Sequence, residues 1–387
     1  IGMETKDEDH VEHLFNADSH DIILFFTNKG VMHWLNVYEI PEGARTGKGK
    51  AIVNLIKIDQ DEQIRAMLTI RKSMFEENEE LCIAMATKRG VIKKTPLSQF
   101  RHLRKIGIRA LSIDEGDDLI GAELVGPTDE IILSTAKGMA CRFKSSDVRA
   151  MGRTARGVTG LRFKIEGDWI VSMEVVPSEE EPGALPPDGS GNLENAEDQA
   201  EPAAGEEPEV PEEDDEELEP ASDEEDSGES LEDTGKPQIL IVTSGGMGKR
   251  SYVEDYRLTR RGAKGVKNLN LREGEEVVAA VKVRRGDELI ITTERGQVVR
   301  ISVDEIRIVG RASRGVKIME LRKGDRITGV ACLIKVEGQK PQEAEVAVES
   351  GVSESPAESS PDAPETPAAD STGGAPESPT DSSEPAE

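Results

Sequence analysis

The chain has 387 residues, a formal net charge of -29 and only three cysteines. No apolar run approaches the roughly 18 residues that a membrane-spanning helix needs, and no signal peptide is visible, so the sequence predicts neither a membrane protein nor a secreted one. Cys82, Cys141 and Cys332 lie far apart in apolar contexts, which indicates reduced core thiols in a cytosolic protein rather than a disulfide framework or a metal site.

The negative charge is concentrated in two blocks. Residues 178–235 hold 25 Asp and Glu without any Lys or Arg, and residues 341–387 hold 12 on a Ser/Pro/Ala background. Such segments bury too little apolar surface to offset their ordering entropy, so we expect a disordered acidic insertion and a disordered acidic tail. The remainder, residues 1–177 and 236–340, then carries about +8, which is compatible with a nucleic-acid partner.

Five segments along the two remaining parts share one outline. Each has an apolar strand, a Thr- or Ser-containing turn that ends in Gly, and a second short strand: DIILFFTNKGVMHW, ELCIAMATKRGVIKK, DEIILSTAKGMACRF, QILIVTSGGMGKR and DELIITTERGQVVR. A tight hairpin turn ends in a left-handed residue, which favours glycine, so each segment is predicted to be a β-hairpin. The turn glycines are Gly30, Gly90, Gly138, Gly246 and Gly296.

The spacing of the hairpins indicates blades. The intervals between the turn glycines are 60, 48, 108 and 50 residues, and the long one becomes 50 when the 58-residue acidic block is removed. Repeats of this length with several strands are typical of propeller-like folds. We therefore expect an all-β fold, with residues 1–177 as the first part of the blades and 236–340 as the last. The opening IGMETKDEDH resembles the middle of a domain, so we also expect the chain to be a fragment.

A basic corner follows each hairpin. The segments are ARTGKGK, RKIGIRAL, GRTARGV, TRRGAKGV and GRASRGV. In four of them the last small residue lies 19 residues after the hairpin glycine, at Gly49, Gly157, Gly265 and Gly315, and in the other it is Ala110, after 20. Each corner has at least two cations and no acid in its core. The predicted DNA-binding residues in the corners are Arg45, Lys48, Lys50, Arg104, Lys105, Arg109, Arg153, Arg156, Arg260, Arg261, Lys264, Arg311 and Arg314. Four further cations lie four residues after a hairpin glycine: Lys94, Arg142, Arg250 and Arg300.

Three interpretations of the corners compete. A nucleotide-binding P-loop needs Ser or Thr after its lysine, whereas Lys264 is followed by Gly265. Solvated turns need glycine but place no demand on the sign of the charge. Cations at equivalent positions of successive blades should form a positive belt, which suits the phosphate backbone of bent DNA. Aromatic residues make up only 3% of the chain, too few for a single-strand stacking platform, so duplex DNA is favoured.

The segment TRRGAKG resembles the Q-R-R-G-G-K-G box of the bacterial gyrase A subunits, with Thr259 and Ala263 departing from it. VNLIKIDQDEQI, MATKRGVIKKTPLSQF, RFKSSDVRAMGRTARGV and EIRIVGRASRGV resemble the same family, over about residues 7–177 and 236–335. The resemblance implies a six-bladed β-pinwheel that wraps duplex DNA at the end of one chain of a type IIA topoisomerase. In that family the defining box lies in the first blade, and this chain starts just after that point.

The resemblance also implies which enzyme the chain belongs to and where that enzyme acts. Two A and two B subunits form an enzyme that introduces negative supercoils into DNA, with ATP and Mg²⁺ used in other domains, in the cytoplasm and on the nucleoid of a bacterium. This chain itself is expected to need no cofactor or metal and to have no membrane partner. Two alternatives stay open: the corresponding domain of topoisomerase IV, which serves decatenation, and a propeller-type scaffold whose basic rim binds an acidic protein.

No catalytic constellation is visible. The family cuts DNA with a tyrosine in another domain, and Tyr38, Tyr252 and Tyr256 lack that sequence context, so we interpret them as packing residues. His10 and His13 have no further ligands nearby, which argues against a metal site. The acidic segments are either solubilising spacers or tethered competitors of DNA for the basic belt.

Overall fold

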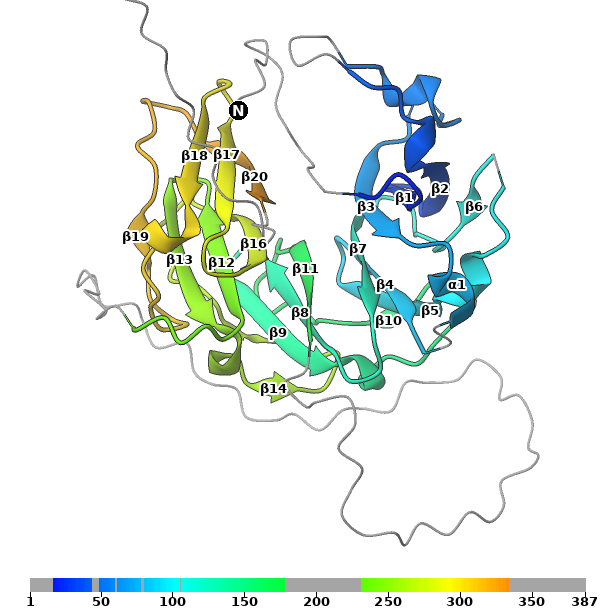
Figure 1. Cartoon of the computed structure of the whole chain (residues 1–387). Helices are drawn as coiled ribbons and strands as arrows, with labels where there is room; N and C mark the ends of the chain where they lie inside the picture. Colours follow the sequence, from blue (N-terminus) through cyan, green and yellow to red (C-terminus); the bar gives the residue numbers. More distant parts are fainter. Residues whose placement is uncertain are drawn as a thin grey trace, which may run out of the picture. The chain divides into compact units, whose positions relative to one another are not determined.

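The computed structural model describes residues 17–43, 49–59, 61–77, 80–104, 106–177 and 231–333 (Figure 1). The predictions for Arg45, Lys48, Lys105, His10 and His13 therefore lie outside the described residues. So do the predicted tail 341–387 and the predicted insertion up to residue 230. No helix within the described ranges has the length and apolar character that crossing a bilayer requires.

The predicted all-β fold is confirmed. The described residues form five sheets in chain order, which follow the colours of Figure 1 from blue to orange. The sheets form a five-bladed propeller-type arrangement. Their strands are β1 (Ile22–Thr27), β2 (Val31–Asn36), β3 (Ile64–Ile70) and β6 (Ile108–Arg109) in the first sheet; β4 (Cys82–Thr87), β5 (Val91–Pro96), β7 (Leu119–Val125) and β10 (Val158–Thr159) in the second; β8 (Glu130–Thr135), β9 (Met139–Lys144), β11 (Ile170–Val176), β14 (Leu258–Thr259) and β15 (Val266–Lys267) in the third; β12 (Gln238–Thr243), β13 (Met247–Tyr252), β16 (Val277–Val283) and β19 (Val316–Lys317) in the fourth; and β17 (Glu288–Thr293), β18 (Val298–Ser302) and β20 (Ile327–Leu333) in the fifth.

Helical structure is limited to short turns between strands. One four-residue α-helix and six 3-10 turns are present in the described residues: α1 (Met74–Glu77), η1 (Val37–Glu39), η2 (Ile52–Asn54), η3 (Leu97–Phe100), η4 (Ser145–Asp147), η5 (Val253–Asp255) and η6 (Val303–Glu305). Five of the 3-10 turns directly follow the second strand of a hairpin, where they lead the chain into a corner.

All five predicted hairpins are present, and a threonine stabilises each of them. The hairpin glycines have φ between 72° and 84°, which is the left-handed region that a side chain disfavours. The threonine hydroxyl before each glycine accepts a hydrogen bond from the backbone N–H four residues later, as Thr135 does from Met139 at 3.1 Å and Thr243 from Met247 at 3.2 Å. This bond explains why the repeated turn contains threonine as well as glycine.

The core lies between neighbouring sheets. The first strands of the hairpins are mainly apolar, and β1 and β4 are buried on both faces. One buried cluster joins Phe26 of the first sheet to Met85 of the second, and another joins Leu240 of the fourth to Ile291 of the fifth. The third strands β3, β7, β11, β16 and β20 contact one another in series. Each sheet is thus stabilised mainly by its neighbours, as in other repeat folds.

Neighbouring sheets also exchange strands, which the sequence did not predict. The short strand after each corner pairs with the preceding sheet: β6 with β2, β10 with β5, β15 with β9, and β19 with β13. Among the described residues, β18 has no strand on its second edge, and the Val298 side chain there is 45% exposed. The corners that end at Gly107, Gly157, Gly265 and Gly315 therefore each bridge two blades.

Candidate nucleic-acid interface

A left-handed glycine stands at the start of each exchanged strand. Gly107, Gly157, Gly265 and Gly315 have φ of 84°, 103°, 78° and 85°. A Cβ at Gly157 would lie 2.6 Å from the Ile92 carbonyl oxygen, and at Gly265 and Gly315 a Cβ would lie 2.7 Å from a carbonyl oxygen of the preceding sheet. Glycine is required by both the backbone angle and the space, so the loops before these residues have a fixed exit onto the neighbouring blade.

The second corner is shorter than the sequence predicted. The N–H of Ala110 donates to the Gly30 oxygen at 2.8 Å, as the N–H of Gly160 does to the Gly90 oxygen. Ala110 therefore corresponds to Gly160, three residues beyond the corner glycine, and its alignment with Gly157 was wrong. Gly107 takes that place. Gly49, the first predicted corner glycine, is exposed and lacks a positive φ.

Exposed cations recur at the same places on three corners. We call these the Gly157, Gly265 and Gly315 corners after their glycines. The residue before the glycine is Arg156, Lys264 or Arg314, and the first two are exposed while Arg314 is partly buried. Arg260 is exposed as well, and so are Lys50, Arg104 and Arg109 on the earlier corners. Arg156 also forms a 3.3 Å ion pair with Asp114, in which both side chains are more than half exposed.

Three exposed arginines were missed by the sequence analysis. They are Arg149, Arg257 and Arg307, and each lies eight residues before its corner glycine. Residues next to them run parallel to the second hairpin strand of the preceding sheet, through the bridges Lys94–Ala150 and Arg250–Ile308 and the β14–β9 pair. Their recurrence at one offset was visible in the sequence, and the parallel pairing explains why the offset is constant.

Three of the predicted DNA-binding cations instead hold blades together in this structure. Lys94 donates to the Ser145 oxygen at 2.8 Å, and Arg142 donates to the Val253 and Tyr256 oxygens at 2.9 and 3.0 Å. Arg250 donates to the Ile306 oxygen at 2.6 Å. Each acceptor lies in or beside the 3-10 turn of the next blade, so these side chains are oriented into the protein and we leave them out of the proposed contact surface.

The fourth cation of this set, Arg300, is exposed and hydrogen-bonded to Glu288 at 2.7 Å. Two corner arginines also contact the preceding corner's strand. Arg261 donates to the Thr159 oxygen at 3.3 Å and Arg311 to the Lys267 oxygen at 2.7 Å. Both arginines are partly buried, and with Arg153 they form the inner part of the corners. Successive corners are thus linked to one another along the chain of blades.

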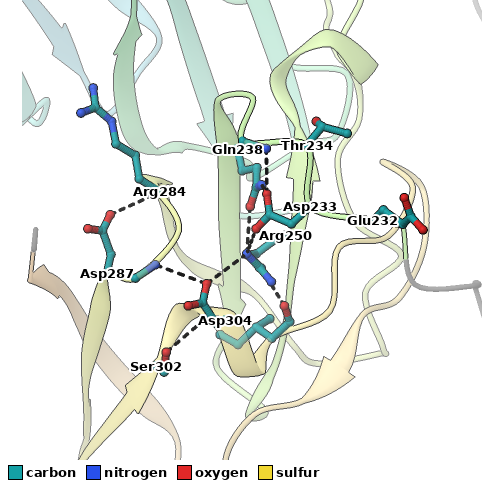
Figure 2. A network of polar contacts seen from close by, with 12 residues as sticks. Glu232, Asp233, Thr234, Gln238, Arg250, Arg284, Asp287, Ser302 and Asp304 are labelled. Atoms are coloured by element: carbon teal, nitrogen blue, oxygen red, sulfur yellow. Dashed lines mark hydrogen bonds and ion pairs between the residues drawn. The ribbon is translucent and has the colours of Figure 1, made fainter.

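A carboxylate from the end of the acid-rich segment completes one of these inter-blade contacts (Figure 2). Arg142 and Arg300 each pair with the glutamate that begins their own sheet, Glu130 and Glu288. In the fourth sheet that place is held by Gln238, an uncharged side chain, and Asp233 supplies the nearer of two carboxylates to Arg250, at 3.2 Å. The other is Asp304, at 4.0 Å.

The backbone around Asp233 is also held in place. Leu231 donates its N–H to the Ile308 oxygen at 2.9 Å, and the Tyr252 hydroxyl bonds to the Glu232 oxygen. Residues 231–235, predicted to belong to the insertion, are thus bound to the fourth sheet and to the corner that contains Ile308.

Removing the Asp233 carboxylate is expected to destabilise the fold. Asp233→Ala should lower the free energy of unfolding by about 1–2 kcal/mol, because the buried Arg250 guanidinium loses its nearest counter-charge. The guanidinium keeps its amide and carbonyl partners and the more distant Asp304 carboxylate, at 4.0 Å. Urea unfolding at neutral pH measures the difference. Glu232→Ala, an exposed neighbour, is the matched control, and equal stability of the Asp233 variant and the wild type would contradict the assignment.

The stability difference between the wild type and Asp233→Ala should also depend on pH, and it should become smaller as pH falls. Burial alone raises the pKa of Asp233, but the Gly235 N–H and the Arg250 guanidinium outweigh it and hold the pKa below its usual value. A carboxyl with a lowered folded pKa stabilises the protein above its unfolded pKa, near 4, and loses that contribution as pH falls through the folded pKa. The wild type and Asp233→Ala should therefore converge in stability in acid.

The other candidates show no catalytic arrangement. Tyr252 and Tyr256 are buried as predicted, whereas Tyr38 is 66% exposed, so its interpretation as a packing residue was wrong. Trp169 lies under the ammonium groups of Lys88 and Lys137, at 5.2 and 5.7 Å from the ring centre. No group of three potential metal ligands occurs in the part of the chain that the structure describes.

Known proteins have sequences similar to this repeated arrangement of sheets. The family profile described as "DNA gyrase C-terminal domain, beta-propeller" matches residues 21–71, 83–125, 129–177, 237–284 and 287–333, one match for each sheet. The A subunits of several bacterial DNA gyrases are similar over about three quarters of this chain: the Staphylococcus epidermidis protein is 32% identical over 287 residues, 74% of this chain and 26% of the relative. The Chlamydia trachomatis protein is 36% identical over 289 residues, 74% of this chain and 27% of the relative.

Solved structures are similar in fold. A crystal structure of the C-terminal domain of DNA topoisomerase IV aligns with a TM-score of 0.62 at 22% identity, covering 85% of this chain and 84% of that one. A DNA gyrase A C-terminal domain aligns with a TM-score of 0.57 at 22% identity, covering 82% and 84%. The chain spans about a quarter of the length of the curated relatives it matches. It belongs to the family of DNA gyrase C-terminal β-propeller domains.

Proposed function

We propose that this chain binds duplex DNA and wraps it as the C-terminal domain of a gyrase A subunit. The observation that carries the proposal is the recurrence of exposed cations at one geometric place on successive blades. Six such side chains are fully on the surface of the three corners: Arg149, Arg156, Arg257, Arg260, Lys264 and Arg307. A repeated turn needs its glycine, but it does not need a cation eight residues earlier, as all three of these corners have.

The chemistry of these corners suits a phosphate backbone. Guanidinium groups donate to phosphate oxygens in a planar, two-pronged geometry, and binding through phosphates releases counterions without reading the base sequence. Because consecutive corners are linked by exchanged strands and by the Arg261 and Arg311 contacts, their cations are held at a regular repeat. A regular row of phosphate contacts on a series of twisted blades favours a bent duplex.

The whole enzyme is a further part of the proposal. The relatives are DNA gyrase A subunits, and we infer that this chain works with the remaining domains of such a protein and with gyrase B subunits in an A2B2 assembly. That assembly would hydrolyse ATP with Mg²⁺ in other domains and introduce negative supercoils, in the cytoplasm and on the nucleoid. We also propose a sixth blade, in line with the open second edge of β18 among the described strands.

Two measurements on the 387-residue chain test the proposal. Affinity for a fluorescent duplex, measured from about 50 to 200 mM salt, should give a log–log slope of about −5 if six cations each contact one phosphate. An acidic peptide of equal charge should bind much more weakly; no binding of duplex would overturn the proposal and favour the protein-interaction scaffold.

Wrapping is tested by linking number. The chain is bound to nicked plasmid, the nick is ligated, and the topoisomers are resolved after removal of the protein. A positive shift that grows with protein supports chiral wrapping and the gyrase assignment. Binding without a shift would contradict wrapping by this chain and favour the topoisomerase IV alternative.

A further inference from the structure

One side chain lies directly beneath each corner, three residues after the hairpin glycine of the preceding sheet. Under the Gly107 corner this residue is His33, whose Cε1 a Cβ at Gly107 would approach to 2.7 Å. Under the Gly265 corner it is Cys141, with its Sγ 3.4 Å from the Thr259 hydroxyl. Under the Gly157 and Gly315 corners it is a lysine, Lys93 or Lys249, and both lysines are fully buried.

Lys93 bonds to two successive corners. Its Nζ donates to the Arg153 oxygen in the Gly157 corner and to the Ala110 oxygen just after the Gly107 corner, each at 2.5 Å. Burial, together with the nearby charge of Arg153, lowers the pKa of Lys93 to about 8. An ammonium taken out of water is costly unless its donors are satisfied, so this residue type is not what packing alone would select.

Lys249 repeats the arrangement two sheets later. Its Nζ donates to the Gly310 oxygen at 2.9 Å and to the Arg311 oxygen. Arg153 and Arg311 hold the same place in their corners, four residues before the corner glycine. The same carbonyl is therefore bound by a buried ammonium in two copies of the corner, which share the sequence pattern Gly-Arg-x-x-Arg-Gly-Val.

We propose that Lys93 and Lys249 are positioning residues for DNA binding, which draw the carbonyls of the Gly157 and Gly315 corners inward and so fix the exposed cations of these two loops for phosphate contact. The inference rests on the proposed function and deepens it, because it distinguishes the corners that a buried lysine holds from those that have another residue beneath them. The Gly265 corner has the sequence most similar to the family box, yet an uncharged thiol lies beneath it.

A packing role and a positioning role predict different results for methionine. Methionine is unbranched, of similar length and apolar, and it fills irregular space well. If the lysines only pack, Lys93→Met and Lys249→Met should be neutral or stabilising and should leave DNA binding unchanged. If they position the corners, the same variants should lose DNA affinity without losing stability.

The test compares the wild type, the two single variants and the double variant, all in the full chain. We expect the double variant to bind duplex about 10-fold more weakly at physiological salt, with a salt slope reduced by about 2, because the ordered cations of two corners are lost. Its thermal unfolding midpoint should equal or exceed that of the wild type. Trypsin should cut faster after Arg153 and Arg311, which reports the loosened loops without using DNA.

A charge-matched control separates position from net charge. Lys29→Met also removes one cation, from a hairpin turn where Lys29 pairs with Asp61, and should change affinity by less than about 2-fold. Equal losses from Lys29→Met and Lys93→Met would overturn the inference. Unchanged affinity and slope in the double variant would overturn it while leaving the proposed function standing, and a wild type that does not bind duplex would overturn both.

The pH dependence of DNA binding by the wild type provides a second test. The groups that face the Lys93 ammonium are the Arg153 guanidinium and the two carbonyl oxygens. Loss of the Lys93 proton between about pH 7 and 9 should weaken DNA binding severalfold, whereas exposed lysines keep their protons until about pH 10. The Lys93→Met variant should show a smaller decrease, because other groups that ionise over this range, such as Glu123 and Glu174, are the same in both chains. Identical profiles for the two chains would overturn the inference for Lys93.

Discussion

Replacing Arg149, Arg257 and Arg307 together by glutamine is expected to weaken duplex binding by about 100-fold at physiological salt and to lower the magnitude of the salt slope by about 3. The three side chains are exposed, so their loss should leave the unfolding transition unchanged. One phosphate contact is removed from each of three consecutive corners, so the loss of affinity should exceed that of any single substitution. Fluorescence anisotropy across a salt series measures both quantities.

The control removes the same charge from other exposed sites. Arg71, Arg272 and Arg322 are arginines outside the corners, and the triple glutamine variant at these positions has the same net charge. It should keep the wild-type slope, apart from a small loss of long-range attraction. Equal losses in the two triple variants would mean that net charge, and not the corner geometry, determines binding.

The hairpins were predictable because their cause is local. A glycine with positive φ and a threonine that caps the same turn lie within five residues of each other. The repeated sequences TNKG, TKRG and TAKG are therefore sufficient to predict the turn. The exchanged strands depend on pairing between segments far apart, as between Val158 and Ile92. A two-residue strand is too short to show an alternating hydrophobic pattern, so the sequence could not predict the exchange of strands between sheets.

The cations of the site were predicted only in part, for a physical reason. A cation at a constant offset is equally consistent with a phosphate contact and with a bond to a carbonyl of the next blade. Lys94 and Arg250 proved to make the second kind of contact, whereas Arg257 lies on the surface. Long side chains can lie along apolar surface in either direction, so only the positions of neighbouring backbone oxygens separate the two cases.

The shift from Ala110 to Gly107 has a similar origin. The sequence interval of about 19 residues favoured Ala110, while the hydrogen bonds to the Gly30 oxygen show that this corner is shorter. Both Gly107 and Ala110 are small residues, so residue size could not choose between them. The backbone angle of Gly107 and its approach to His33 decide the alignment, and neither is visible in a sequence.

Two glutamates between the third strands of neighbouring blades should make stability fall as pH rises. Glu123 accepts the Val175 N–H at 3.1 Å, and Glu174 accepts the Lys282 N–H at 3.0 Å. Burial raises the pKa of Glu123 to about 7, against the Lys282 charge and the Val175 N–H. Burial and the nearby Glu123 carboxylate raise the pKa of Glu174 to about 8, against the Lys282 N–H and charge.

The sign of the pH dependence follows from proton counting. Between the unfolded pKa, near 4.5, and the folded values of about 7 and 8, the folded chain binds more protons than the unfolded chain, so the free energy of unfolding decreases as pH rises. Lys93 acts in the opposite direction, because its lowered pKa makes the folded state lose its proton first. Its contribution begins only near pH 8 and is the same in any variant that leaves Lys93 in place.

Glu174→Gln should remove most of this decrease. The amide keeps an acceptor oxygen for the Lys282 N–H but cannot ionise, so the variant and the wild type should be similar at about pH 5, and the variant should be more stable by about 3 kcal/mol at about pH 9. Urea unfolding across this pH range measures the difference, and subtracting the two curves cancels the Lys93 contribution. Glu288→Gln, at an exposed pair with Arg300, is the control and should show no such divergence. A constant difference between Glu174→Gln and the wild type across this range would mean that Glu174 is already ionised in mild acid, and that Lys282 outweighs burial in the contact between the blades.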